Sequence, residues 1–302
     1  MSGPAAGGLL AELAPAAEAL LERHLASART WYPHELVPWS RGQDMPAGRP
    51  QPPGDAGPLP GGVRSALIVN LLTEDGLPFY LAGLLDSFGE DHPWGAWVRR
   101  WTAEEGRHAI VIRDYLAVTR SVDLRALERA RMAHIEHAPV PSTPTPAEAF
   151  VYLALQELGT RIAHRNTGLL LDDPTGDRIM AQVAADENLH HLFYRDLVTA
   201  ALALDPSATV AAIDAQVRHF AMPGATIPGF EAHAAAIAAA GIYSAAALHE
   251  HVLVPLVARH WDLGRLEGLD PAGERARERV LRFIDRLGRI AGRLAGSPVT
   301  LP

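Results

Sequence analysis

The feature that most constrains this sequence is a polar pattern that occurs twice inside otherwise apolar segments. The first copy lies in EEGRH at residues 104–108 and the second in DENLH at residues 186–190, and each contains Glu-x-x-His. Residues three apart share one face of a helix, and the neighbouring apolar residues repeat at helical spacing. Each Glu and His is therefore predicted to lie on a buried face. Because an unpaired buried carboxylate is costly, something must neutralise these groups.

Two further carboxylates turn this pattern into a duplicated unit. Glu74 precedes Glu105 by 31 positions, and Glu157 precedes Glu187 by 30 positions. Both lie among apolar residues of long segments that are predicted to be helical. The unit is one Glu followed by one Glu-x-x-His, and it predicts a metal site. Its expected ligands are Glu74, Glu105, His108, Glu157, Glu187 and His190.

Four segments with the apolar periodicity of long helices carry these residues, and Gly- and Pro-containing stretches separate them. A helix is predicted before them, from about Leu9 to Ala28, and a helical region after them that ends near Leu294. Residues 41–64 contain 12 Gly or Pro and predict a surface loop or linker. The four segments are residues 63–88, 94–118, 146–171 and 175–202.

Composition supports an all-α fold and limits the chemistry. Hydrophobic residues make up 48% of the chain and aromatic residues only 6%, which favours helices, and 302 residues fit one domain, residues 1–302. The chain has no cysteine, so a metal would be held by His, Asp and Glu. The net charge of −8 argues against nucleic acid as a main partner. No run of 18 apolar residues and no basic N-terminal region occur, so we expect a soluble cytoplasmic protein without a membrane span.

The expected ligand set is the one found in ferritin-like di-iron and di-manganese bundles. Zinc prefers fewer, tetrahedral ligands and calcium avoids imidazole, which leaves iron, favoured for its chemistry, or manganese. The motifs LLTEDGLPFY, WTAEE-x-RH, QE-x-x-T-x-x-x-H-x-NT and AADE-x-x-H resemble those of the soluble acyl-carrier-protein desaturases of plant plastids and actinobacteria. The resemblance covers about residues 25–290. It implies a ferritin-like four-helix bundle core with additional N- and C-terminal helices.

The same resemblance implies an activity, a cofactor and partners. The six ligands would hold two Fe2+ ions, and a ferredoxin-type protein would supply electrons. Dioxygen would then be used to remove two hydrogens from adjacent carbons of an acyl chain on acyl carrier protein, in fatty acid or lipid biosynthesis. We also expect a homodimer.

The resemblance further implies roles for Asp186 and Trp31. Asp186 would accept a hydrogen bond from His108 across the bundle, as carboxylates behind metal-bound histidines commonly do. Trp31, in the motif TWYPHE, would extend this relay toward the surface. Simple packing of an aromatic residue at the end of a helix is the alternative for Trp31.

Thr160 and Pro78 lie close in sequence to expected ligands. Thr160 follows Glu157 by three residues, so its hydroxyl is predicted to lie on the metal-facing side and to assist dioxygen chemistry. The alternative is a hydrogen bond back to a carbonyl of its own helix. Pro78 cannot donate to the carbonyl of Glu74, and a kink is expected there. Widening of the bundle and simple fitting of the core are both open explanations.

Some motifs depart from the family pattern, and other functions remain alternatives. EEGRHA stands where the family has EENRHG, and DENLHH where it has DEKRHE. Gly106 costs about 1 kcal/mol in a helix interior, and His191 adds a second imidazole beside His190. A related di-iron oxygenase, a hydroxylase or N-oxygenase acting on another substrate, is the main alternative, followed by an iron-storage bundle. A radical-generating ribonucleotide reductase subunit is disfavoured because Ile112 stands where that subunit has tyrosine.

An acidic carrier protein requires a basic surface on this acidic chain. Residues 274–294 contain seven Arg and three acidic residues. Arginine-rich helices are also common as ordinary solvated faces, so an arginine cluster alone does not identify a docking surface. The second candidate is the cluster Arg113, Arg120, Arg125, Arg129 and Arg131.

Overall fold

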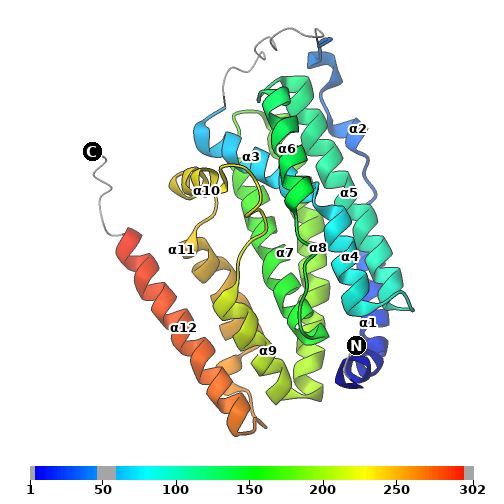
Figure 1. Ribbon diagram of the computed structural model, residues 1–302, viewed down its shortest axis with the longest axis vertical. Coiled ribbons are helices and arrows are strands. Elements are labelled where there is room, and N and C mark those ends of the chain that lie inside the picture. Colours follow the sequence, from blue (N-terminus) through cyan, green and yellow to red (C-terminus); the bar gives the residue numbers. More distant parts are fainter. Residues whose placement is uncertain (1–3, 46–58, 296–302) are drawn as a thin grey trace.

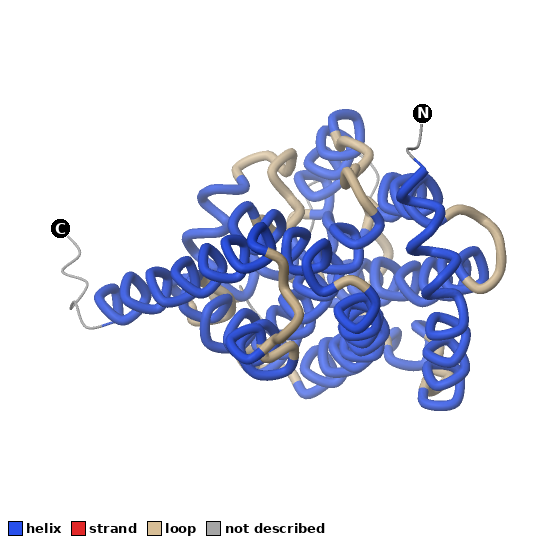
Figure 2. Tube along the Cα trace, turned by 90° about the horizontal axis from the view of Figure 1, so that it is seen from below, coloured by secondary structure: helices blue, strands red, loops and turns tan. Residues whose placement is uncertain are grey.

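The computed structural model describes residues 4–45 and 59–295, and within these residues every regular element is a helix (Figures 1 and 2). The predicted all-α fold is confirmed. Four helices form the core of the bundle, with contacts between α3 and α5, α5 and α8, α8 and α7, and α7 and α3. Figure 1 shows α5, α7 and α8 running along the long axis of the molecule. The bounds of the four helices are α3 Gly61–Glu74, α5 Trp94–Thr119, α7 Pro146–Leu169 and α8 Pro174–Leu204.

The first of the four predicted segments is two helices rather than one. Helix α3 ends at Glu74, and α4, Leu77–Phe88, begins after a two-residue turn with Pro78 in its first turn. The ring of Pro78 removes the N–H that would continue the helix, so the expected kink is a full break. This break leaves Glu74 at the C-terminal end of its helix.

Side-chain capping explains where four of the helices begin. The side chains of Asp123, Asp173 and Asp205 accept hydrogen bonds from backbone N–H groups at the starts of α6, α8 and α9. Thr145 does the same for α7, and α7, α8 and α9 each have proline in the first turn. Helices α6, Leu124–His137, and α9, Pro206–His219, were not among the predicted elements.

The terminal helices surround this core. Helix α1, Pro4–Ser27, packs against α8, and α10, Phe230–Ala239, packs against α3. Of the predicted loop at 41–64, residues 46–58 lie outside the described residues, and the described part becomes helical at Gly61. The remaining elements are α2 Pro33–Leu36, η1 Trp39–Arg41, α11 Ala245–Ala247, the π-helix η2 Leu248–His260, η3 Leu263–Arg265 and α12 Pro271–Ala295.

Two apolar cores lie on either side of the middle of the bundle. One includes Trp97 and Tyr194, and the other includes Ile112 and Met180. Helices α5 and α8 pass through both cores, so the residues at their centres lie between two well-packed layers. Among the described residues, no helix has the length and apolar character needed to cross a membrane.

Candidate metal centre and adjoining cavity

The structure brings all six expected ligands together between the two apolar cores, and all six are buried. They form two overlapping groups, and within each group the potential ligand atoms lie within 4.8 Å of one another. The first group is Glu74, Glu105, His108 and Glu187, and the second is Glu105, Glu157, Glu187 and His190.

Glu105 and Glu187 belong to both groups, whereas the other four ligands divide between them. Each group therefore has one imidazole, one carboxylate of its own and two shared carboxylates. This arrangement suits two cations that are bridged by carboxylates, and it has the two-fold pattern of the duplicated sequence unit.

The two ligand histidines are held by carboxylates on the side that faces away from the cluster. Nε2 of His108 lies 3.4 Å from Oδ2 of Asp186, and Nε2 of His190 lies 3.0 Å from Oε2 of Glu104. Each Nδ1 is thereby turned toward the shared carboxylates. Such a bond to a carboxylate is the usual way in which a protein fixes the ring of a metal-binding histidine.

Several atoms at the centre of the cluster are buried without hydrogen-bond partners among the described residues. They include Nδ1 of both histidines, Oε1 of Glu105 and Oε2 of Glu157. Nδ1 of His190 lies 2.8 Å from Oε1 of Glu105, but the geometry is not that of a hydrogen bond. Buried polar atoms rarely stay unpaired, and lone pairs that converge on one point are what a cation requires. Four carboxylates and two imidazoles also balance the charge of two divalent cations, so these residues fit such a pair.

The charged groups of the cluster perturb one another strongly. Burial, reinforced by Glu105 and Glu157, raises the pKa of Glu187 well above its ordinary value. Burial alone would lower the pKa of His108, but the surrounding carboxylates, Glu105 first, raise it well above its ordinary value. The metal-free cluster therefore retains protons that partly neutralise its carboxylates. Bound cations would replace these protons.

Glu104 and His24 were missed by the sequence analysis. Nε2 of His24 lies 2.8 Å from the same Glu104 oxygen that faces His190, and Nη2 of Arg100 lies 2.5 Å from the other oxygen. Glu104 precedes Glu105 as Asp186 precedes Glu187, so the acidic pair in each motif was the available signal. His24 lies far from the motif in the sequence, so no local pattern pointed to it.

His164 on α7 is a third imidazole beside the cluster. Its Nε2 lies 3.2 Å from Oε1 of Glu74. Burial would raise the pKa of Glu74, but the neighbouring imidazoles of His108 and His164 lower it to about 2. His164 follows Glu157 by seven residues and so shares its helix face, which was the signal for it in the sequence.

Trp31 and Asp186 contact each other beside His108. Nε1 of Trp31 donates to Oδ2 of Asp186 over 2.9 Å, and the Trp31 ring stacks on the His108 ring with centroids 6.4 Å apart. The guanidinium of Arg107 also lies 2.8 Å from Asp186 and covers the Trp31 ring. Asp186 thus connects His108 to a nearly buried aromatic residue at the edge of the bundle.

Thr160 is close both to a ligand and to carbonyls of its own helix. Its Oγ1 lies 2.8 Å from Oε2 of Glu187, 3.0 Å from the carbonyl of Glu157 and 3.2 Å from that of Gln156. The single hydroxyl hydrogen cannot serve all three acceptors equally. The Glu187 carboxyl is the nearest of the three.

A cavity of about 310 Å³ adjoins the cluster. Glu74, Glu105, Glu187 and Thr160 belong to its wall, and α4 and α7 contribute apolar and aromatic side chains to the remainder. The cavity is covered by residues from the loops that follow α6 and α9. These wall residues include Tyr80, Leu84, Ala149, Tyr152, Leu153, Pro139, Pro141, Met222 and Pro223.

Gly83 allows the loop after α6 to lie directly on α4 above this cavity. A Cβ at Gly83 would lie 2.5 Å from the carbonyl oxygen of Pro141, which is too close for any side chain. The roof of the cavity therefore depends on a glycine in the middle of a helix, at a cost in helix propensity. The fold and this arrangement of buried acids and imidazoles define a ferritin-like bundle of the class that holds paired metals.

Comparison with known proteins places the chain in a family. Residues 7–299 match the family described as fatty acid desaturase, and the chain belongs to that family. DesA1 of Mycobacterium tuberculosis, named as a candidate acyl-[acyl-carrier-protein] desaturase, is 39% identical over 289 residues, which cover 92% of this chain and 85% of DesA1. Stearoyl-[acyl-carrier-protein] 9-desaturase 1 of Oryza sativa subsp. indica is 31% identical over 283 residues, which cover 87% of this chain and 74% of the rice protein.

A solved structure agrees with this assignment. The X-ray structure of DesA2 from Mycobacterium tuberculosis, also named as a candidate acyl-ACP desaturase, superposes with a TM-score of 0.72 at 29% identity. The match covers 89% of this chain and 99% of the DesA2 chain. The resemblance to acyl-carrier-protein desaturases that the motifs indicated is therefore confirmed.

Proposed function

We propose that this protein is a di-iron, dioxygen-dependent desaturase that acts on an acyl chain carried by acyl carrier protein. The observation that carries the proposal is the cavity whose wall contains Glu74, Glu105 and Glu187 together with apolar and aromatic side chains. A methylene chain in this cavity would pass directly beside the cluster. An iron-storage bundle has no use for such a cavity.

The six buried ligands would hold the two iron ions, which supply the oxidation of unactivated C–H bonds with dioxygen. The chain's own residues orient the ligands and exclude water. Asp186 and Glu104 fix the two imidazole rings, and the apolar cores on both sides keep the centre dry. Thr160 is placed to donate a hydrogen bond to Glu187 and so to hold that carboxylate in one orientation.

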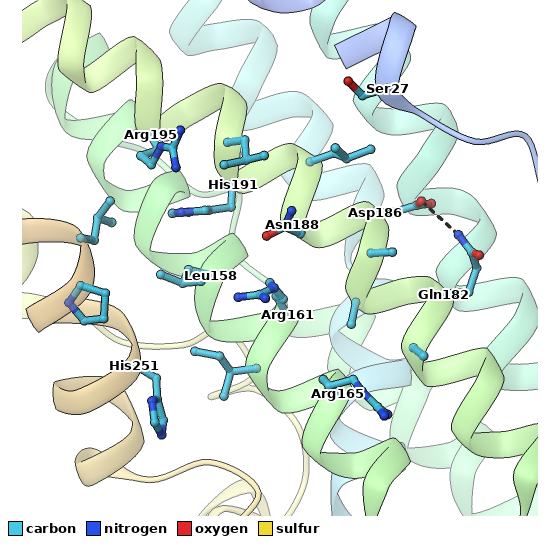
Figure 3. A pocket seen from close by; sticks show the side chains of 18 of the residues that line it. Ser27, Leu158, Arg161, Arg165, Gln182, Asp186, Asn188, His191, Arg195 and His251 are labelled. Atoms are coloured by element: carbon cyan, nitrogen blue, oxygen red, sulfur yellow. Dashed lines mark hydrogen bonds between the residues drawn. The ribbon is translucent and has the colours of Figure 1, made fainter. Parts of the chain in front are cut away.

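The path for electrons is proposed to run through Trp31, Asp186 and His108. Asp186 also lines a groove of about 1040 Å³ along α7 and α8, whose wall includes Arg161, Arg165 and Arg195 (Figure 3). An acidic electron carrier of the ferredoxin type would dock over this groove, where Arg165 and Arg195 also pair with Asp177 and Asp196. The donor would then lie next to Asp186, the middle residue of this path.

We propose α12 as the basic surface that binds acyl carrier protein. Arg282 lies 3.1 Å from Glu278, and Arg279 lies 2.7 Å from Asp214, so neighbouring acids neutralise part of the charge. Arg113 and Arg131, from the second candidate cluster, also pair with acids, Asp75 and Glu128 respectively.

The proposed assembly is a homodimer.

Iron content and product mass test the proposal together. The purified protein should bind about two iron ions per chain, and Glu105→Ala or His190→Ala should lower that number substantially. Iron-loaded protein is then incubated with ferredoxin, its reductase and a panel of acyl carriers. Loss of two hydrogens identifies a desaturase, and gain of oxygen identifies the oxygenase alternative. One tetrahedral zinc per chain, or unchanged iron in both variants, contradicts the proposal.

A further inference from the structure

Three polar residues line the acyl cavity without a role in the proposed chemistry. His134, on α6, is 3% exposed, and its Nδ1 lies 2.7 Å from Oγ1 of Thr226. Among the described residues, Nε2 of His134 and Oγ1 of Thr143 are buried and have no hydrogen-bond partner. All three residues belong to the cavity wall. A cavity for a purely hydrocarbon chain has no need of them.

The contact between His134 and Thr226 is built by the fold from residues 92 positions apart. Thr226 lies in the loop between α9 and α10, which turns at Gly224 with a φ of +127°. A Cβ at Gly224 would lie 2.7 Å from the Phe230 ring, so glycine is required there both for the φ and for space. A hydrogen bond from Ile227 N to the Gly224 carbonyl closes the turn. Thr226 is thus delivered to His134 by a defined loop conformation.

A count of hydrogens shows that this pair retains a donor. Burial lowers the pKa of His134, although Asp75 and the Leu72 carbonyl partly offset this, so the ring is neutral near pH 7. A neutral imidazole and a hydroxyl have two polar hydrogens between them, and their mutual bond uses one. If Thr226 donates, the N–H at Nε2 is left over. If the ring donates from Nδ1, the Thr226 hydroxyl hydrogen is left over.

Among the described residues these leftover hydrogens make no hydrogen bond, and the Leu72 carbonyl is the acceptor within the chain that lies near the His134 ring. Thr143 contributes another hydroxyl hydrogen, so a hydrocarbon that filled this part of the cavity would leave at least two donors unpaired. Each unpaired donor costs about 1–3 kcal/mol. The carbonyl of Leu72, two residues before Glu74, lies near the His134 ring. The His134 ring is therefore close to the metal end of the cavity.

We propose that His134, Thr226 and Thr143 form a polar subsite that binds a carbonyl or hydroxyl oxygen of the acyl substrate. The inference rests on the proposed function, because it takes an acyl chain as the occupant of the cavity. Two sources can supply the oxygen: the thioester that links the chain to its carrier, or an oxygen substituent on the chain itself. By holding this oxygen, the subsite fixes which carbons lie beside Glu74 and thus where the double bond forms.

The test measures binding without turnover. Iron-loaded full-length protein, without reductant, is titrated with three carriers: a palmitoyl thioester, the matching alkyl thioether that lacks the carbonyl, and a β-hydroxy palmitoyl thioester. The wild-type protein should favour an oxygen-bearing ligand by about five- to tenfold over its oxygen-free match. Thr226→Val, which keeps the shape of the side chain, and the double variant His134→Leu with Thr226→Val should reduce this preference toward one.

Tyr152→Phe is the matched control, because it removes a cavity hydroxyl that already lies 3.4 Å from the carbonyl of Ala221. It should retain the full preference. A preference for the thioester over the thioether identifies the carrier link as the source, and a preference for the β-hydroxy chain identifies the chain. Equal preference in wild type and Thr226→Val overturns the subsite but leaves the desaturase proposal intact. Failure of all three carriers to bind overturns both.

Discussion

Substitution of Glu104 tests whether this carboxylate, which faces His190 as Asp186 faces His108, positions a proposed metal ligand. Oε2 of Glu104 lies 3.0 Å from Nε2 of His190 and 2.8 Å from Nε2 of His24, and the residue is buried. Glu104→Gln keeps the size of the side chain but removes the charge. Glu104→Ala removes the acceptor altogether. Neither substitution alters one of the six proposed ligands.

The expected loss is in metal affinity. Removing the carboxylate behind a metal-binding histidine lowers affinity about 10- to 100-fold, which corresponds to ~1.4–2.8 kcal/mol. This range agrees with the ~1.5–3 kcal/mol of a hydrogen bond to a charged group, and in this structure Glu104 makes one such bond to His190. We expect Glu104→Ala to lie near the upper end of the range. Glu104→Gln should lie near the lower end, because its amide oxygen can still accept from His190.

The assay is a competition titration of Fe2+ or Co2+ against a chelator of known affinity, under anaerobic conditions. His190 belongs to only one of the two ligand groups, so one metal equivalent should weaken before the other. Glu148→Gln is the control, since Glu148 makes an ordinary 2.9 Å bond from Gln216 at the start of α7 and is remote from the cluster in its contacts. Thermal unfolding of each metal-free variant separates lost affinity from lost fold.

Two outcomes would refute this reasoning. If Glu104→Ala binds both metal equivalents as tightly as the wild type, the carboxylate does not position His190. If Glu148→Gln weakens binding as much as Glu104→Ala does, the loss reflects general destabilisation rather than the relay.

Three further predictions concern pH, the hydroxyl at the cluster and the carrier. Burial lowers the pKa of His191 to about 4, so between pH 6.5 and 4 the unfolded chain binds a proton that the folded protein does not. The free energy of unfolding should then fall by up to ~3 kcal/mol across this range, and denaturation of His191→Gln should lack this component. Thr160→Val should keep the iron content but lower the product formed per dioxygen consumed, with more peroxide released; an unchanged ratio assigns Thr160 to packing. Reversal of charge at Arg282 and Arg286 should slow association with acyl carrier protein as high salt does, whereas equal turnover of free and carrier-bound fatty acid contradicts carrier docking.

The cluster of carboxylates and imidazoles could be predicted from sequence because it depends on local periodicity. Glu105 and His108 share a face by helix geometry alone, and the apolar residues around them show which face is buried. The turn after Glu74 could be foreseen in part, since Pro78 interrupts hydrogen bonding wherever the helix lies. Whether the helix would kink or break completely could not be foreseen, because both result from the same missing N–H.

The elements that roof the cavity could not be predicted in the same way. Helix α6 has charged residues on much of its surface and buries Leu127 and His134, so its apolar periodicity is weak. Thr226 reaches His134 only through a loop whose path depends on Gly224 and Phe230. Contacts between segments this far apart in sequence arise from tertiary packing, and no local sequence pattern predicts them.

The two carboxylate relays explain why each motif begins with an acidic pair rather than with a single Glu. Asp186 in the second motif faces His108 of the first, and Glu104 in the first motif faces His190 of the second. Each helix therefore supplies the residue that orients the imidazole of the other, and neither motif is complete alone. The partners behind the two carboxylates then differ, with Trp31 on one side and an imidazole on the other. Among the described residues, Asp186 belongs to the wall of the arginine-lined groove proposed for the electron donor, whereas Glu104 and His24 do not.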